Sequence, residues 1–148
     1  MVYNRLVNKT NTHRPKTKGS IKMLKFKNLI VRKGSAFRGL RLQYDDIDYI
    51  EFIDPIEEDA YIKVITLSKK FYELPTHEVD FDGIKVDGYI GTWYTIDRVI
   101  IQGQLYYLLE HEEYGDEAEH LIIDYTGNLI LDEVYNGFDD LEEFLETD

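Results

Sequence analysis

Residues 95–140 read TIDRVIIQGQLYYLLEHEEYGDEAEHLIIDYTGNLILDEVYNGFDD and contain the clearest strand pattern of the chain. An apolar run over residues 89–101 meets Gln102-Gly103, and a second run follows over residues 104–110. Two such runs around a glycine-containing turn are typical of a β-hairpin. The same pattern recurs over residues 120–131, where Thr126-Gly127-Asn128 separates two shorter runs. This part of the chain therefore predicts an antiparallel sheet.

A short helix is predicted after Asn136-Gly137, near the C-terminal end. Asp139 or Asp140 can cap it, and an apolar stripe at i, i+3 and i+4 comprises Leu141, Phe144 and Leu145. A helix of this length needs tertiary packing, so we expect the stripe to lie on the sheet.

Towards the N-terminus the pattern also favours strands. Residues 60–67 alternate and are rich in β-branched side chains, and residues 21–42 form a strand or a hairpin around Gly34-Ser35. Residues 45–54 fit a strand, with Ile47, Tyr49 and Glu51 on one face, or a helix that begins at Asp45. We expect a turn or short helix over residues 68–74, and turns with one very short strand over residues 76–88.

Together these elements predict an α+β domain, dominated by an antiparallel β-sheet of about six to eight strands with one short C-terminal helix. At 148 residues we expect one acidic β-rich domain over residues 21–148. Residues 1–20 lack periodicity, so we expect a flexible basic tail; an incorrectly assigned start site is the alternative.

The composition excludes several classes of protein. The chain has no cysteine, which excludes disulfides and thiolate metal sites. No apolar run approaches the roughly 18 residues of a membrane span, and no apolar segment typical of a signal peptide follows the first basic residues. We therefore expect a cytoplasmic protein without membrane contact.

Charge is distributed very unevenly. Residues 1–44 hold twelve Lys or Arg and no acid, whereas residues 45–148 hold five Lys or Arg and all 29 acids. Arg98 is the last basic residue, and fifteen acids follow it. Such asymmetry indicates partners related to nucleic acids, or a basic strand that packs beside acidic ones and partly neutralises them.

Catalytic motifs are missing from the sequence. There is no nucleophile elbow, phosphate loop or dinucleotide fingerprint, so we predict no enzyme and no cofactor. The second alternative is a metal-dependent enzyme in which His111 and His120, with nearby carboxylates, bind a divalent metal. Two acidic groups, residues 54–59 and 116–119, lack the spacing of a calcium loop, and we expect them to be solvated loops.

The high density of Asp and Glu residues is the strongest indication of function. A negative field of this kind attracts proteins that bind nucleic acids, although solubility alone is the simpler explanation. The predicted partner-binding residues are the exposed acids of two segments: Glu110, Glu112, Glu113, Asp116, Glu117 and Glu119, and secondly Asp139, Asp140, Glu142 and Glu143.

Residues 92–140 also resemble a known family. The residues that carry the resemblance are Trp93-Tyr94-Thr95-Ile96-Asp97, Gly103, Tyr106, Leu108-Leu109-Glu110-His111-Glu112, Tyr114-Gly115-Asp116, Ile122-Ile123-Asp124, Gly127 and Tyr135-Asn136-Gly137-Phe138-Asp139. They resemble a large polyvalent protein-associated domain, a type found in phage and conjugative-element proteins. The resemblance implies a mobile-element setting and supplies no catalytic residues.

The sequence thus leads to one main functional hypothesis and one principal alternative. The main hypothesis is a non-enzymatic phage or mobile-element protein, similar in type to anti-CRISPR proteins, that inhibits a host nucleic-acid-binding enzyme, with DNA mimicry as the expected means. A CRISPR effector is the expected partner, and the acidic domain itself is expected not to bind DNA. The alternative is a regulatory or scaffolding module whose tyrosine-rich sheet faces bind another protein.

Overall fold

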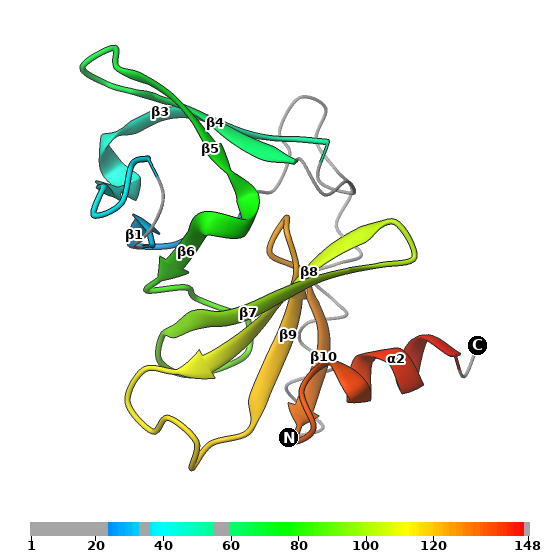
Figure 1. Ribbon diagram of the computed structural model, residues 1–148. Helices are drawn as coiled ribbons and strands as arrows, with labels where there is room; N and C mark the ends of the chain where they lie inside the picture. The colour runs from blue at the N-terminus through cyan, green and yellow to red at the C-terminus, as the bar shows by residue number, and fades with distance from the viewer. Residues whose placement is uncertain (1–23, 33–35, 55–59, 147–148) are drawn as a thin grey trace.

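The computed structural model describes residues 24–32, 36–54 and 60–146 (Figure 1). This part of the chain forms ten β-strands in three antiparallel sheets, two short 3-10 helices and one α-helix at its C-terminal end. The predicted α+β class, a small sheet-dominated domain with one short C-terminal helix, is confirmed. The strand number is higher than the predicted six to eight, because two short strands lack a clear alternation in the sequence.

A four-stranded sheet occupies the centre of the fold. Its order is β10-β9-β8-β7, and its strands are β7 (Trp93–Ile101), β8 (Gln104–His111), β9 (His120–Asp124) and β10 (Leu129–Val134). The predicted tight turn joins β7 to β8, and both of its residues have positive φ, 53° at Gln102 and 74° at Gly103. The two predicted hairpins are therefore confirmed, except that the first strand begins at Trp93 rather than at residue 89.

Both faces of β8 are buried. Leu105, Tyr107 and Leu109 face a main core that extends across all three sheets. Tyr106 and Leu108 face a smaller core on the helix side, together with Ile122, Val134 and Leu141. A strand that is paired on both edges and buried on both faces fixes the register of the whole sheet.

The helix α2 (Phe138–Glu146) covers the helix-side core through Leu141, which is fully buried. Phe138 and Leu145 pack beside it. The predicted stripe is wrong in one residue, since the Phe144 side chain is 47% exposed. The positions that pack on this core are spaced i, i+3 and i+7, and the apolar face is rotated away from Phe144.

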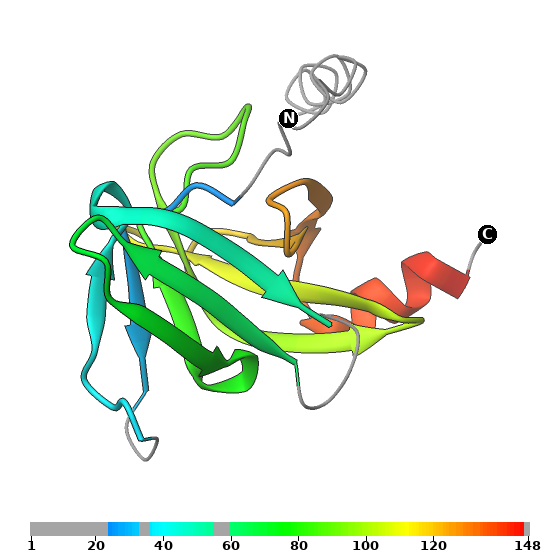
Figure 2. The same ribbon diagram turned by 90° about the horizontal axis from the view of Figure 1, so that it is seen from above.

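Two three-stranded sheets cover the other face. One has the order β2-β1-β6, with β1 (Asn28–Val31), β2 (Arg41–Gln43) and β6 (Val79–Asp82). The other has the order β3-β4-β5, with β3 (Ile47–Ile53), β4 (Tyr61–Thr66) and β5 (Phe71–Pro75). In Figure 2 β3, β4 and β5 lie across one face of β7 and β8, and α2 lies beyond the opposite face.

The structure resolves the ambiguity over residues 45–54 in favour of a strand. A 3-10 turn, η1 (Tyr44–Asp46), precedes β3, and a register shift lies between Ile47 and Tyr49. This bulge places Ile47 against the main core, whereas Tyr49 points outward. The prediction that both share one face is therefore wrong, because a bulge breaks strict alternation.

Two further predictions need correction. Residues 71–75 form β5 rather than a turn or helix, and Tyr72 and Leu74 face the core. Residues 76–82 form the 3-10 turn η2 (Thr76–Glu78) and then β6, in which Val79 and Phe81 are buried. Both strands are short and flanked by turn residues, so periodicity alone could not separate them from loops.

Basic residues from the first strands neutralise acids of β6. The Nε of Arg32 lies 3.5 Å from Asp80, and Arg41 lies 3.8 Å from Asp82. Arg98 also pairs with Asp80 and donates a hydrogen bond of 2.9 Å to the His77 carbonyl. Arg32 directly follows β1 and Arg41 lies in β2, so the prediction that a basic segment packs beside acidic ones is confirmed for the sheet β2-β1-β6.

Several predictions concern residues outside the described ranges, namely the basic tail, the turn at Gly34-Ser35 and the acids within residues 55–59. Where the structure describes the chain, no helix is long and apolar enough to cross a membrane.

Candidate functional site

The acidic loop, residues 110–119, comprises the last two residues of β8 and the connection to β9, and it contains the first group of predicted partner-binding residues. Two backbone hydrogen bonds fold it back on itself, from Gly115 N–H to the His111 carbonyl (2.9 Å) and from Glu117 N–H to the Tyr114 carbonyl (3.0 Å). Gly115 has a φ of 54°, which a glycine adopts without strain. The loop is therefore tied into turns at the edge of the sheet.

The His111 side chain packs under the acidic loop and hydrogen-bonds to its backbone. Its side chain is buried and lies between the rings of Trp93 (4.8 Å) and Tyr114 (4.9 Å). Its Nδ1 accepts hydrogen bonds from the N–H groups of Glu113 and Tyr114, at 3.0 and 3.2 Å. The ring proton must then be on Nε2, which donates to the Ile90 carbonyl at 3.2 Å. Both ring nitrogens are engaged, so His111 has a structural role.

Glu112 fastens the loop to its neighbours. Its carboxylate accepts hydrogen bonds from Gly83 N–H (2.6 Å) and from the Thr92 hydroxyl (2.9 Å). This arrangement connects the acidic loop to the turn after β6 and to the segment before β7. Glu112 is exposed, but its carboxylate oxygens are already hydrogen-bonded within the protein.

Glu110 is only partly exposed and faces two side chains of the sheet. It accepts a hydrogen bond of 2.8 Å from the Tyr94 hydroxyl, and its other oxygen lies 3.5 Å from Nε2 of His120. The hydrogen bond to this carboxylate raises the pKa of Tyr94. Glu110 therefore differs from the fully solvated acids that the sequence predicted at this position.

Three acids of the loop do point into solvent. Glu113 and Glu117 are exposed, and the Asp116 side chain is 89% exposed. Glu119 is half-buried and makes interactions of its own. The loop thus displays charge mainly at residues 113–117, on a backbone that His111 and Glu112 hold in place.

The second predicted group lies on α2. Asp139, Glu142 and Glu143 are exposed there. Asp140 instead accepts hydrogen bonds from the N–H groups of Tyr135 (2.8 Å) and Asn136 (3.0 Å), and these bonds lower its pKa. Because Val134 pairs with His120, the segment leading into α2 starts beside the strand position where the acidic loop ends.

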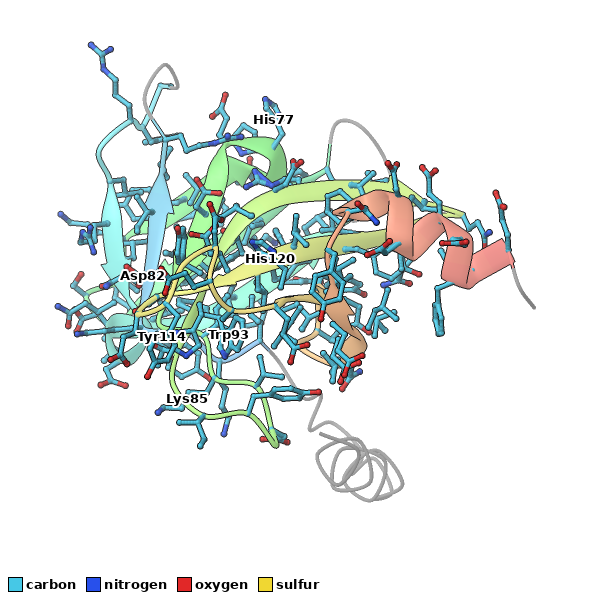
Figure 3. All side chains as sticks on the ribbon, turned by 90° about the horizontal axis from the view of Figure 1, so that it is seen from below. His77, Asp82, Lys85, Trp93, Tyr114 and His120 are labelled. Carbon is cyan, nitrogen blue, oxygen red and sulfur yellow. The ribbon has the colours of Figure 1, made fainter. Side chains whose placement is uncertain are left out.

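The three described histidines have different surroundings. His77 lies in η2, apart from His120 (Figure 3). His111 is packed under the acidic loop, and His120 faces Glu110. The joint site of His111 and His120 that the sequence allowed is therefore not formed. His120 instead meets Glu110 and Asp116, and their ligand atoms lie within 4.8 Å of one another.

The sequence alone does not predict this cluster, because the register between β8 and β9 brings Glu110 and His120 together. The one available signal was that all three residues lie within eleven positions around a loop predicted to join two strands.

Comparison with known proteins gives one match. The model of a family described as large polyvalent protein-associated domain 18 matches residues 76–147, just under half of the chain. The match supports the resemblance predicted over residues 92–140 and extends it to β6 and α2. It supports an association with phage or mobile-element proteins. The chain matches no curated protein and no solved structure.

Proposed function

We propose that this protein is a non-enzymatic acidic binding protein of a phage or mobile element, and that it inhibits a host defence enzyme that binds nucleic acid. A CRISPR effector is the expected target. The exposed acids of the acidic loop and of α2 would occupy the basic cleft that normally holds DNA or RNA.

The observation that carries the proposal is a set of exposed carboxylates fixed to a rigid sheet, in a part of the chain without Lys or Arg. Glu113, Asp116 and Glu117 project from a loop whose N-terminal end is held by hydrogen bonds of Glu112 and His111. Charges held in a fixed arrangement lose little entropy on binding, so they favour association more than the same charges on a mobile tail.

Electrostatic attraction also favours the proposed class of partner. Duplex DNA carries one phosphate charge per about 1.7 Å of axis, and proteins that bind it present basic clefts. All fifteen acids after Arg98 lie in a segment without a compensating Lys or Arg. Such a field accelerates association with a basic cleft, and added salt weakens the effect.

The test is a competition assay with a purified RNA-guided nuclease and a fluorescent target duplex. The wild-type protein should displace the duplex, with a weaker effect at about 300 mM than at about 50 mM salt. The triple variant Glu113→Gln, Glu117→Gln, Glu142→Gln should need about 10-fold more protein, since exposed ion pairs contribute up to about 1 kcal/mol each. It should also depend less on salt.

The matched control is Asp45→Asn, Asp46→Asn, Asp48→Asn, which removes the same number of charges from exposed positions on η1 and β3. It should compete as wild type does. Equal weakening by both triples would assign the effect to net charge rather than to this surface. A Glu113/Glu117/Glu142 variant that competes as well as wild type would refute the electrostatic mechanism.

A second candidate function rests on the outer face of β3, β4 and β5. The strand register aligns Tyr49, Ile65 and Phe71 in one row, with Tyr49 45% and Phe71 54% exposed. An apolar row of this kind is typical of a protein contact in a regulatory or scaffolding module. In that case Phe71→Ser would abolish partner binding, and both charge triples would leave it unchanged.

A further inference from the structure

A polar row crosses three strands of the central sheet at the base of the acidic loop. Tyr94 of β7 pairs with Glu110 of β8, and the neighbouring pair Leu109 and Leu121 aligns Glu110 with His120 of β9. The Tyr94 hydroxyl donates to Oε2 of Glu110, which leaves Oε1 facing His120. The third member, Asp116, reaches the same point from the exposed turn of the loop.

The two separations that involve His120 match a metal-ligand set, and all three ligand atoms lie within 4.8 Å of one another. Nε2 of His120 lies 3.5 Å from Oε1 of Glu110 and 4.0 Å from Oδ1 of Asp116. Ligands about 2.1 Å from a metal lie roughly 3.0 to 4.2 Å from one another in tetrahedral or octahedral geometry. Glu110 and His120 are positioned by paired strands, whereas Asp116 lies on an exposed turn and can adjust.

A second observation points to a ligand at this place. Nε2 of His120 is buried and has no hydrogen-bond partner among the described residues, although two carboxylates surround it. The distances to these oxygens are too long for hydrogen bonds. A buried polar atom without a partner costs free energy, and a cation bound between the three residues would remove that cost.

We propose that Glu110, Asp116 and His120 bind a divalent first-row transition-metal ion, with Zn²⁺ as the best fit. Imidazole favours zinc-like ions over Mg²⁺ and Ca²⁺, and two carboxylates complete a three-residue set. Because Asp116 is 89% exposed, water can complete the coordination sphere. Tyr94 orients Glu110 through its hydrogen bond, as outer partners of metal ligands commonly do.

Bound metal would fix Asp116 to the sheet and so fasten the middle of the acidic loop to β8 and β9. This inference goes beyond the proposed function, because metal binding is measured without any partner. Zn²⁺ binding can fail while the competition result stands, and competition can fail while Zn²⁺ still binds.

The experiment uses the full chain, freed of metal with a chelator, and Zn²⁺ alone as the probe. Native mass spectrometry should give one bound ion, and calorimetric titration should give a dissociation constant in the micromolar range or below. Asp116→Asn and His120→Gln should each raise it at least 10-fold, and Tyr94→Phe about 10-fold, the range seen when outer-shell partners are lost. Asp116 is exposed, so its variant keeps the fold.

Two controls make the test specific. Glu113→Gln removes one charge from the same loop, and His13→Gln removes a histidine far away in the sequence; both should bind Zn²⁺ as wild type does. Equal affinity of Asp116→Asn and wild type would overturn the proposal. So would Ca²⁺ or Mg²⁺ binding as tightly as Zn²⁺, because His120 would then contribute nothing.

Discussion

Single residues of the main core show how polar groups are tolerated in this fold. The Tyr107 side chain is fully buried, packs edge-on against Phe81 and lies 5.8 Å beneath the Arg98 guanidinium. Its hydroxyl has no hydrogen-bond partner among the described residues, and burial raises its pKa. Packing of the ring stabilises the fold, whereas burial of the hydroxyl without a hydrogen bond destabilises it.

Removing that hydroxyl should therefore increase stability. We expect Tyr107→Phe to raise the free energy of unfolding by about 1 kcal/mol, because the variant loses only a desolvated, unpaired group. Tyr94→Phe is the control, since its hydroxyl donates to Glu110, and it should lose about 1 kcal/mol. Urea denaturation in chelator-containing buffer measures both. A destabilised Tyr107→Phe would mean that the hydroxyl is hydrogen-bonded, for example to a buried water.

At the scale of elements, local sequence patterns predicted the long hairpins correctly but did not predict the short strands. Hairpins with a glycine turn and long apolar runs, such as β7 and β8, were visible because alternation and turn chemistry agree. β5 and β6 were missed because five- or four-residue strands next to Pro75 and Gly83 carry too few alternations. The cluster of Glu110, Asp116 and His120 depends on the register between strands, which no local pattern specifies.

The helix α2 gives a prediction about pH. Asp140, its third residue, accepts two backbone hydrogen bonds that hold its pKa below the usual value. A lowered pKa in the folded state adds stability above the unfolded value near 3.9, and this stability is lost as pH falls through the folded pKa. Asp140→Asn should therefore lower the free energy of unfolding at pH 5 to 7, by a fraction of about 1 kcal/mol because solvent screens the exposed carboxylate, and the loss should shrink as pH falls below the unfolded value.

Denaturant titrations at several pH values provide the measurement for Asp140. Asp139→Asn is the matched control, because it removes one charge from the same helical turn and leaves the two bonds to Asp140 intact. A constant difference between wild type and Asp140→Asn down to pH 2 would contradict the role of the charged carboxylate.

At the scale of the whole molecule, the family match and the fold have different boundaries. The matched residues 76–147 include β6 to β10 and α2, but β6 pairs with β1, and the main core takes residues from β1, β3, β4 and β5. Leu29, Ile62, Val64 and Leu74 are fully buried and lie outside the match. The sequence predicted the class of the fold, but it did not show that the core spans this boundary.

A fragment of residues 76–147 should therefore fail to fold. Each buried aliphatic side chain contributes about 1.5 to 3 kcal/mol, and four of them approach the entire stability of a typical domain. The fragment should give a poorly dispersed amide NMR spectrum, and the full chain a dispersed one with a cooperative thermal transition. A well-dispersed fragment spectrum would show that the matched segment is an independent unit.

The central place of β1 in its sheet also affects the order of events during protein synthesis. β1 lies between β2 and β6, and β6 follows it by roughly 50 residues of chain. At translation rates of about 5 to 20 residues per second, β1 remains for roughly 2 to 10 s without one of its two neighbours. During that interval its apolar side chains and nearby basic residues are accessible, and the acids that later neutralise the arginines have not yet been made. The newly made chain therefore passes through a cationic, incompletely paired state before it becomes a strongly acidic protein.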